Sequence, residues 1–328
     1  RPYGRKRAPK GAHARPWGYF EKKPAGICQQ STTFARQDIN LSYQKMSAKY
    51  TLKDLCTQTR RDILRMIGAV NSGHPGGSLG ATEFMVGLFN KVMDHTPAPF
   101  DPDGREQDLF FLSNGHLSAL LYSVLARTGY FPVSELATFR RLNSRLQGHP
   151  ATKEGLPGIR MASGSLGQGL SVAIGAALTK KLNGDKHLVY TLHGDGELEE
   201  GQIWEAIMYA GSKGVDNIVA TIDANGCQID GTTDQVMSLG NLEDKFRAFG
   251  WDVIHIGDGN DVEQVIFGLE KAKAMTGKGR PIAVIMKTMM GNGVDFMMHT
   301  HKWHGQAPNK EQLEKALAQN PETVLGDY

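Results

Sequence analysis

The sequence predicts an α/β fold in which a parallel sheet carries helices on both faces. Two observations lead to this prediction. From about residue 187 onward, short apolar runs alternate with segments of helical periodicity, and uninterrupted apolar strands between helices are typical of a parallel sheet buried on both sides. The 39 glycines are mostly clustered, and several clusters follow expected strands, where such sheets bind their ligands.

The elements can be placed in order along the chain. Apolar residues recur at helical spacing from Thr51, and this first helix should end at Asn71-Ser72-Gly73. Further helices are expected at residues 81–93, 115–127, 134–142, 164–181, 198–212, 240–249, 261–274 and 309–319, and strands at 109–112, 187–192, 218–223, 251–256 and 282–286.

The first 46 residues differ in composition from the rest. They hold ten Lys/Arg and two Asp/Glu, a balance of +8, which leaves −5 for the remaining 282 residues. We interpret residues 1–46 as an irregular basic extension, disordered or artefactual, before a start at Met46, and residues 47–328 as one domain. An RNA-binding arm and an organelle transit peptide are the alternatives for the extension. The mildly acidic body lacks the electrostatic footprint of nucleic-acid binding.

Cysteine usage and hydropathy bear on the compartment. Cys28, Cys56 and Cys227 show neither metal nor redox spacing, and their odd number argues against a disulfide framework. We therefore expect a reducing, cytoplasmic compartment. No apolar run reaches membrane-spanning length, and no secretory signal with an apolar core is seen, so no membrane partner is expected.

The strongest chemical signal is Gly194-Asp195-Gly196-Glu197 after one expected strand, coupled to Asn225 after the next. Both polar residues follow strands of one β-α-β unit, so they can point into one pocket. The Asp195 carboxylate, the Asn225 amide oxygen and a nearby backbone carbonyl, that of Cys227, would supply three hard oxygen ligands for Mg²⁺, or alternatively Ca²⁺. We expect a helix from Leu198 whose N-terminus favours phosphate oxygens. Two ordinary strand-to-helix turns are the alternative interpretation.

This spacing resembles the signature of thiamine-diphosphate enzymes, and further motifs resemble those of the transketolase family. Six ordered motifs carry the resemblance, which covers nearly all of residues 50–310: Ser72–Gly77, Leu112–His116, Gly148–Pro150, Gly164–Gly169, Gly194–Gly201 and Trp303–Gly305. The resemblance implies a thiamine-diphosphate-binding fold for residues 47–328, with thiamine diphosphate and the divalent cation as cofactors.

Four histidines in these motifs each adjoin glycine, which suits donors and acceptors for a polyhydroxylated substrate better than core residues. The resemblance gives catalytic roles to three of them, with His149 facing the donor sugar's hydroxyls and His74 and His304 lining the reacting carbon. The cofactor-binding residues it implies are His116 near the diphosphate, Gly164 and Leu166 against the rings, Gly196, Glu197, Asn225, and Glu200 in a carboxylate network that reaches a partner.

The sequence departs from the family pattern at three positions. Ala224 precedes Asn225 where the family usually has a second Asn, which leaves the metal ligand in place. Met290 and Asn114 stand where some transketolases carry lysine. These two changes put the substrate preference in doubt but leave the cofactor assignment intact.

The resemblance implies transfer of a two-carbon ketol unit from a ketose phosphate to an aldose phosphate. Transketolase chains are about twice as long, and their second half supplies the activating glutamate and the pyrimidine pocket. We therefore expect the chain to need a C-terminal transketolase subunit, in an α2β2 assembly. Another thiamine-diphosphate enzyme (a 2-oxo acid dehydrogenase or deoxyxylulose-phosphate synthase type) and a non-catalytic cofactor-binding subunit remain alternatives. A plain nucleotide-binding domain is disfavoured because no G-x-G-x-x-G or P-loop follows a first strand.

Overall fold

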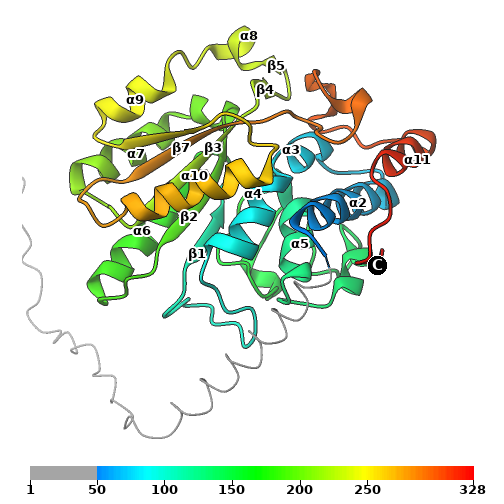
Figure 1. Ribbon diagram of the computed structural model, residues 1–328, viewed down its shortest axis with the longest axis horizontal. Helices are drawn as coiled ribbons and strands as arrows, with labels where there is room; N and C mark the ends of the chain where they lie inside the picture. Colours follow the sequence, from blue (N-terminus) through cyan, green and yellow to red (C-terminus); the bar gives the residue numbers. More distant parts are fainter. Residues whose placement is uncertain (1–49) are drawn as a thin grey trace, which may run out of the picture. The chain divides into compact units, whose positions relative to one another are not determined.

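The computed structural model describes residues 50–328, which lie within one compact unit, Lys45–Tyr328. Its centre is a five-stranded sheet in the order β1-β2-β3-β7-β6, in which all neighbours are parallel (Figure 1). The strands are β1 (Leu109–Leu112), β2 (Val189–Gly194), β3 (Ile218–Ala224), β6 (Asp252–Ile256) and β7 (Ile282–Lys287). The predicted parallel α/β sheet is confirmed.

Alternate residues of each strand enter two separate hydrophobic cores. Phe110 and Leu112 of β1 belong to the core on one face, whereas Leu109 and Phe111 belong to the core on the other. Helices α2, α4, α5 and α10 cover the first face, and α6, α7 and α9 cover the second. Both faces are therefore buried, which explains why the strands are continuously apolar.

The helices agree broadly with the prediction. They are α2 (Leu52–Val70), α3 (Pro75–Gly80), α4 (Thr82–Gly87), α5 (Ser118–Arg127), α6 (Gly169–Leu182), α7 (Gly201–Lys213), α8 (Thr233–Met237), α9 (Leu242–Ala248), α10 (Val262–Met275) and α11 (Lys310–Gln319). The bounds of α2 follow from local chemistry. Thr51 and Asp54 form a capping box at its start, and Asn71 adopts the left-handed conformation at its end.

Four expected helices differ from the structure. The helix expected at residues 164–181 begins only at Gly169, as α6. Residues 81–93 contain α4 followed by one π-helical turn, η1 (Leu88–Val92), and residues 134–142 hold only a short 3₁₀ helix, η3 (Val133–Thr138), which ends at residue 138. The helix expected from Leu198 is a 3₁₀ turn, η5 (Gly196–Glu199), and α7 begins at Gly201 because Glu200 has extended backbone angles. The small hairpin of β4 (Cys227–Gln228) and β5 (Gly231–Thr232) was not predicted.

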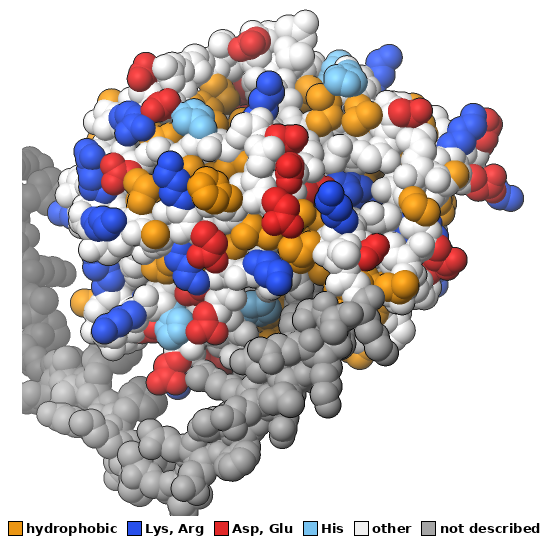
Figure 2. Space-filling model, viewed as in Figure 1, with side chains coloured by type: hydrophobic (Ala, Val, Ile, Leu, Met, Phe, Trp, Pro, Cys, Tyr) orange, Lys and Arg blue, Asp and Glu red, His pale blue; other side chains and the backbone are white. Residues whose placement is uncertain are grey.

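The extension proposed for residues 1–46 lies outside the described residues. Within the described part, no helix is both long and apolar enough to cross a membrane. Figure 2 shows basic and acidic side chains interspersed on one face of the molecule. That face therefore carries no single-sign patch of the kind that binds nucleic acid.

Candidate functional site

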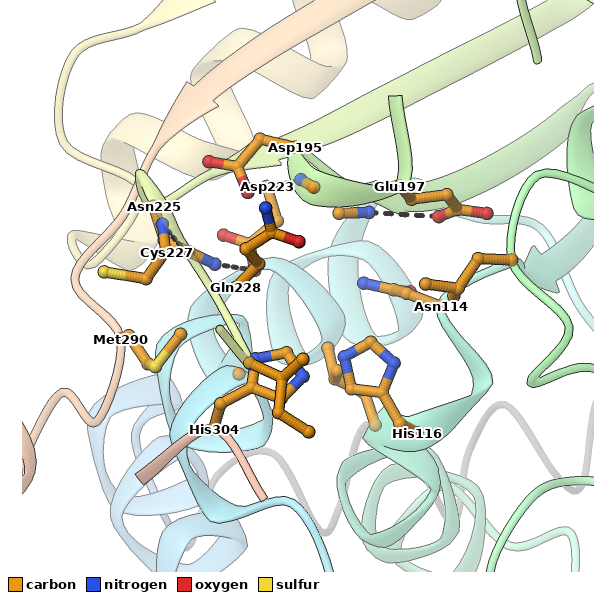
Figure 3. Close-up of a pocket in the computed structure, with 16 residues that line it drawn as sticks. Asn114, His116, Asp195, Glu197, Asp223, Asn225, Cys227, Gln228, Met290 and His304 are labelled. Atoms are coloured by element: carbon orange, nitrogen blue, oxygen red, sulfur yellow. Dashed lines mark hydrogen bonds between the residues drawn. The ribbon is translucent and has the colours of Figure 1, made fainter. Parts of the chain in front are cut away.

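Two neighbouring parallel strands end side by side at the candidate site (Figure 3). β2 and β3 run in register, with Gly194 opposite Asp223. Asp195 follows β2 and Asn225 follows β3, so the carboxyl ends of the two strands bring both side chains to one edge of the sheet. This is the arrangement that the 30-residue spacing predicts.

Asp195 is held by backbone groups from both loops. Its Oδ1 accepts from the Gly196 N–H at 2.8 Å, and its Oδ2 accepts from the Gly226 N–H at 2.6 Å. Its side chain is buried, and that burial, together with the nearby Asp223 carboxylate, raises the pKa of Asp195 to about 7. The carboxylate is fixed in place but electrostatically uncompensated.

Asp223 is the second buried carboxylate at this edge. Its Oδ2 accepts from Asn225 Nδ2 at 3.0 Å, and the Thr288 hydroxyl donates to its Oδ1. Burial raises the pKa of Asp223 to about 6. Two adjacent buried carboxylates without a cation destabilise one another, so a divalent ion fits this place by charge.

Asn225 and Cys227 belong to one tight turn. Asn225 Oδ1 accepts from the Cys227 N–H at 2.9 Å, which places the predicted amide and carbonyl ligands on the same short segment. Among the described residues, no three His, Cys, Asp or Glu side chains gather as a metal-binding group. A cation here would therefore depend on amide and backbone oxygens beside Asp195, as hard cations commonly do.

Glu197 ties together the glycine loops around the site. Its carboxylate accepts from the Ser113 hydroxyl, from the Gly167 N–H at 2.9 Å and from the Gly194 N–H at 3.1 Å. The buried His193 has its Nδ1 atom 3.6 Å from Oε2 of Glu197. Despite burial, these donors lower the pKa of Glu197. Glu197 therefore lines the cavity as a fixed anion whose oxygens already have protein partners.

The four glycine-flanked histidines form one cluster, although they come from four separate segments of the chain. The ring centroid of His74 lies 5.2 Å from that of His116, 6.0 Å from that of His149 and 5.8 Å from that of His304. His116 and His304 are 5.0 Å apart. The structure thus brings together all four histidines that the sequence singles out.

The cluster is held neutral. Burial, followed by the neighbouring histidines and Arg140, lowers the pKa of His74 to about 4. The pKa of His116 lies well below its usual value for the same main reason, and those of His149 and His304 are also lowered by burial. Neutral imidazoles can both donate and accept hydrogen bonds, which suits contact with sugar hydroxyls.

The remaining predicted residues occupy different places. Leu166 and Gly196 line the same cavity as Asp195 and His304. Gly164 has φ +124°, and a Cβ there would lie 2.6 Å from the His149 ring, so glycine is required for this close approach. Glu200 is exposed outside the cavity lining, at the start of α7.

Comparison with known proteins identifies the chain. Residues 53–323 match the family model described as "Transketolase, thiamine diphosphate binding domain". The chain belongs to the transketolase family. It is 39% identical over 260 residues to the 6-deoxy-6-sulfo-D-fructose transketolase subunit SqwG of Clostridium sp. (strain MSTE9), which covers 79% of this chain and 92% of that relative.

Other transketolases show how much of an enzyme the chain matches. An apulose-4-phosphate transketolase subunit of Actinobacillus succinogenes is 35% identical over 85% of this chain and 96% of its own length. Human transketolase is 35% identical over 84% of this chain but only 42% of its own. The solved transketolase of Leishmania mexicana superimposes with a TM-score of 0.78 at 29% identity, covering 85% of this chain and 42% of that one.

These findings confirm the prediction of an N-terminal, thiamine-diphosphate-binding transketolase subunit, and with it a transferase. The residues present also fit the cofactor pair. Asn114 Oδ1, His74 Nδ1 and His304 Nδ1 are enclosed without a hydrogen-bond partner, and buried polar atoms of this kind call for a ligand. The buried carboxylates call for a cation. The cavity lined by Asn114, His304 and the two carboxylates has a volume of about 90 Å³, well below the roughly 300–1,000 Å³ of pockets that enclose such ligands.

Three residues of the site were given no role by the sequence analysis. Asp223 ends the expected strand 218–223, two residues before Asn225, but nothing in the sequence shows that its carboxylate is buried beside that of Asp195. Thr288 reaches the site only because β7 pairs with β3. Arg140 contacts two of the histidine loops from a segment without any motif. The sheet order could have identified Thr288, but no sequence signal identifies Arg140.

Proposed function

We propose that this chain is the diphosphate- and metal-binding subunit of a two-chain transketolase that moves a two-carbon ketol unit from a ketose phosphate to an aldose phosphate. The observation that carries the proposal is the neutral histidine cluster, two members of which, His116 and His304, line one cavity together with Asp195 and Asn225. A cation-and-phosphate site beside several uncharged hydroxyl-binding groups suits a sugar substrate bound next to a diphosphate cofactor.

Each candidate residue has a role in this proposal. Asp195, Asn225 and the Cys227 carbonyl would hold Mg²⁺, which in turn would hold the diphosphate. Gly196 would let the backbone approach the phosphates, and Glu197 would keep the loops in place. A further set would contact cofactor or substrate: His116 at the diphosphate, Gly164 and Leu166 at the rings, and His74, His149 and His304 at the substrate.

Bound thiamine diphosphate supplies the nucleophilic carbon and the electron sink of this chemistry. The chain's own residues bind, orient and exchange protons. His74 and His304 have enclosed Nδ1 atoms without partners, and their Nε2 atoms are free of protein hydrogen bonds among the described residues. Both are uncharged at neutral pH because their pKa values are lowered, so each can donate a hydrogen bond to a substrate oxygen or accept one from a substrate hydroxyl.

The partner would be a C-terminal transketolase subunit in an α2β2 assembly. Two relatives matched over 92% and 96% of their length are named as transketolase subunits. The cavity of about 90 Å³ is too small to enclose the cofactor, and His149 and Glu200 lie exposed at its side of the molecule. A second protein surface laid over this side would enclose the ligand and give Glu200 a partner.

We propose that the protein works in a reducing cytoplasm. We also propose that its reaction belongs to the conversions of pentose phosphates. Cys56 and Cys227 are both free thiols in the structure, as is usual in that compartment.

The test is a coupled ketol-transfer assay on the chain, on a second-half partner and on their mixture, with thiamine diphosphate and Mg²⁺ present. We expect turnover in the mixture. A mixture that binds the cofactor tightly but transfers no ketol unit from any ketose phosphate would contradict the proposal and favour a non-catalytic binding subunit.

A further inference from the structure

One guanidinium joins the loops that carry two of the clustered histidines. Arg140 Nη1 donates to Ser72 Oγ at 2.9 Å, and Arg140 Nη2 donates to the Gly148 carbonyl at 3.2 Å. Ser72 lies two residues before His74, and Gly148 directly precedes His149. A single side chain therefore spans two loops that are far apart in sequence.

The local backbone is built to admit this side chain. Arg140 has φ +55°, a left-handed conformation that non-glycine residues adopt only where the surrounding structure fixes it. Its N–H donates to the Leu146 carbonyl at 2.8 Å, which closes the loop that leads to His149. A Cβ on Gly148 would lie 2.7 Å from Arg140 Cζ, so glycine leaves the room that the guanidinium fills.

The charge of Arg140 is not balanced by a carboxylate. The nearby Arg145 pairs with Glu135 at 2.8 Å, whereas no acidic side chain in residues 50–328 lies within salt-bridge distance of Arg140. Its Nε is enclosed and has no hydrogen-bond partner. An uncompensated cation is costly to keep half-buried, and this one faces histidines instead of an anion.

We propose that Arg140 is a positioning residue of the donor site: it fixes the separation of His74 and His149 by holding both of their loops. The inference rests on the function proposed above for these histidines. In this role Arg140 contacts neither substrate nor cofactor. The planar guanidinium holds the two loops because it carries two hydrogen-bond donors in a fixed geometry.

The electrostatics of the cluster support this role. After burial, the largest influence on the pKa of His149 is the Arg140 charge, which lowers it. His74 faces His304, Arg140 and His149, all of which lower its pKa, and His116 packs against its ring. The one acidic group that bears on the cluster within residues 50–328 is Asp230, which acts on His304. Removing the Arg140 charge should therefore raise the pKa values of His74 and His149.

The experiment compares Arg140→Lys and Arg140→Met in the assembled enzyme, with the exposed neighbour Arg141→Met as control. Lysine keeps the charge but cannot make both hydrogen bonds, and methionine loses the charge as well. Both variants should therefore lower kcat/KM for the donor about tenfold or more, while cofactor affinity stays within about twofold of the wild-type value. Only Arg140→Met should shift the acid limb of the pH profile of kcat/KM to higher pH, because His74 and His149 protonate more easily once the positive charge is gone. Arg141→Met should change neither.

Three results would overturn the proposal. One is donor kinetics within about twofold of wild type in both Arg140 variants. Another is a loss confined to the phosphorylated form of a ketose donor and absent for the same ketose without phosphate, which would mean direct contact with the phosphate. The third is histidine ring NMR signals of the purified chain that titrate identically in wild type and Arg140→Met.

Two further arms keep the outcome decisive. Ser72→Ala removes one hydrogen-bond acceptor of Arg140 and leaves the charge in place. It should therefore lower kcat/KM for the donor without shifting the pH profile. If the Arg140 variants do not fold, this variant tests the positioning role by itself. The histidine titration needs no partner and no turnover. A shifted titration in Arg140→Met, with no ketol transfer by any assembly, would refute the proposed function while the positioning role stands.

Discussion

The Gly226 N–H donates to Asp195 Oδ2 at 2.6 Å, so the loop after β3 is fastened to the carboxylate that follows β2. With Gly196 bonded to the other carboxylate oxygen at 2.8 Å, Asp195 is oriented before any cation arrives. The remaining lone pairs of both oxygens are free to coordinate a metal, since each carboxylate oxygen offers more than one. The cation therefore meets a preformed ligand.

Replacing Asp195 with Ala should abolish Mg²⁺-dependent binding of thiamine diphosphate by the assembled enzyme. The fold should persist, because the uncompensated carboxylate contributes little to stability in the absence of a cation. Calorimetry of cofactor binding with and without Mg²⁺ measures the effect. Asp234→Ala, at an exposed position on α8, is the matched control. Unchanged cofactor affinity in Asp195→Ala would eliminate this metal site.

Replacing Glu197 with Gln should lower the free energy of unfolding by about 1–3 kcal/mol, since one amide group must face N–H and O–H donors that now meet a carboxylate. Urea unfolding of the purified chain gives the difference. Glu205→Gln, on the exposed face of α7, should change stability by less than about 0.5 kcal/mol. Equal stabilities for the two variants would show that Glu197 does not hold the loops together.

The contrast between these residues shows what the sequence could and could not reveal. Asp195 and Asn225 were predictable because strand ends in a parallel sheet converge on one edge. The support given by Glu197 was not, because its donors come from loops around residues 113, 167 and 194 that only the fold brings together. The start of α7 was predicted wrongly for a related reason. Glu200 has extended backbone angles, and hydrophobic periodicity gives no sign of such a break.

Replacing His149 with Ala should weaken use of the donor ketose by about 1 kcal/mol, roughly fivefold in kcat/KM, which is the net worth of a neutral hydrogen bond. The imidazole is neutral at pH 7 because partial burial and the Arg140 charge lower its pKa. Steady-state kinetics on the assembled enzyme, with cofactor affinity measured in parallel, separates the two roles. His255→Ala, at an exposed site on β6, is the control. A weakened cofactor with normal donor kinetics would assign His149 to the cofactor instead.

The His74 pKa of about 4 predicts how stability depends on pH. In the unfolded chain the group titrates near 6.5, so between these values the unfolded state binds the extra proton. The contribution of neutral His74 to the free energy of unfolding is therefore complete above pH 6.5 and is lost as the pH falls toward 4. The stability advantage of wild type over His74→Asn should shrink over this window by less than about 1.4 kcal/mol per pH unit, since His74 is partly exposed.

Urea unfolding at about pH 7, 6 and 5, which spans this window, measures the difference. Asp195 and Asp223, whose pKa values are raised, change stability with the opposite sign in the same window. That contribution is common to both proteins and cancels in the comparison. Parallel stability curves for wild type and His74→Asn would contradict a buried, neutral His74.

We propose that this chain holds half of a cofactor site, which a partner subunit completes. The direct measurement is thiamine diphosphate affinity and ketol-transfer rate, followed together while a C-terminal transketolase subunit is titrated into the chain with Mg²⁺ present. We predict weak cofactor binding and no turnover by the chain alone, and a joint rise of affinity and rate that saturates at one stoichiometry. Substantial turnover by the purified chain alone, with contamination excluded by mass spectrometry, would show that the chain holds a complete site.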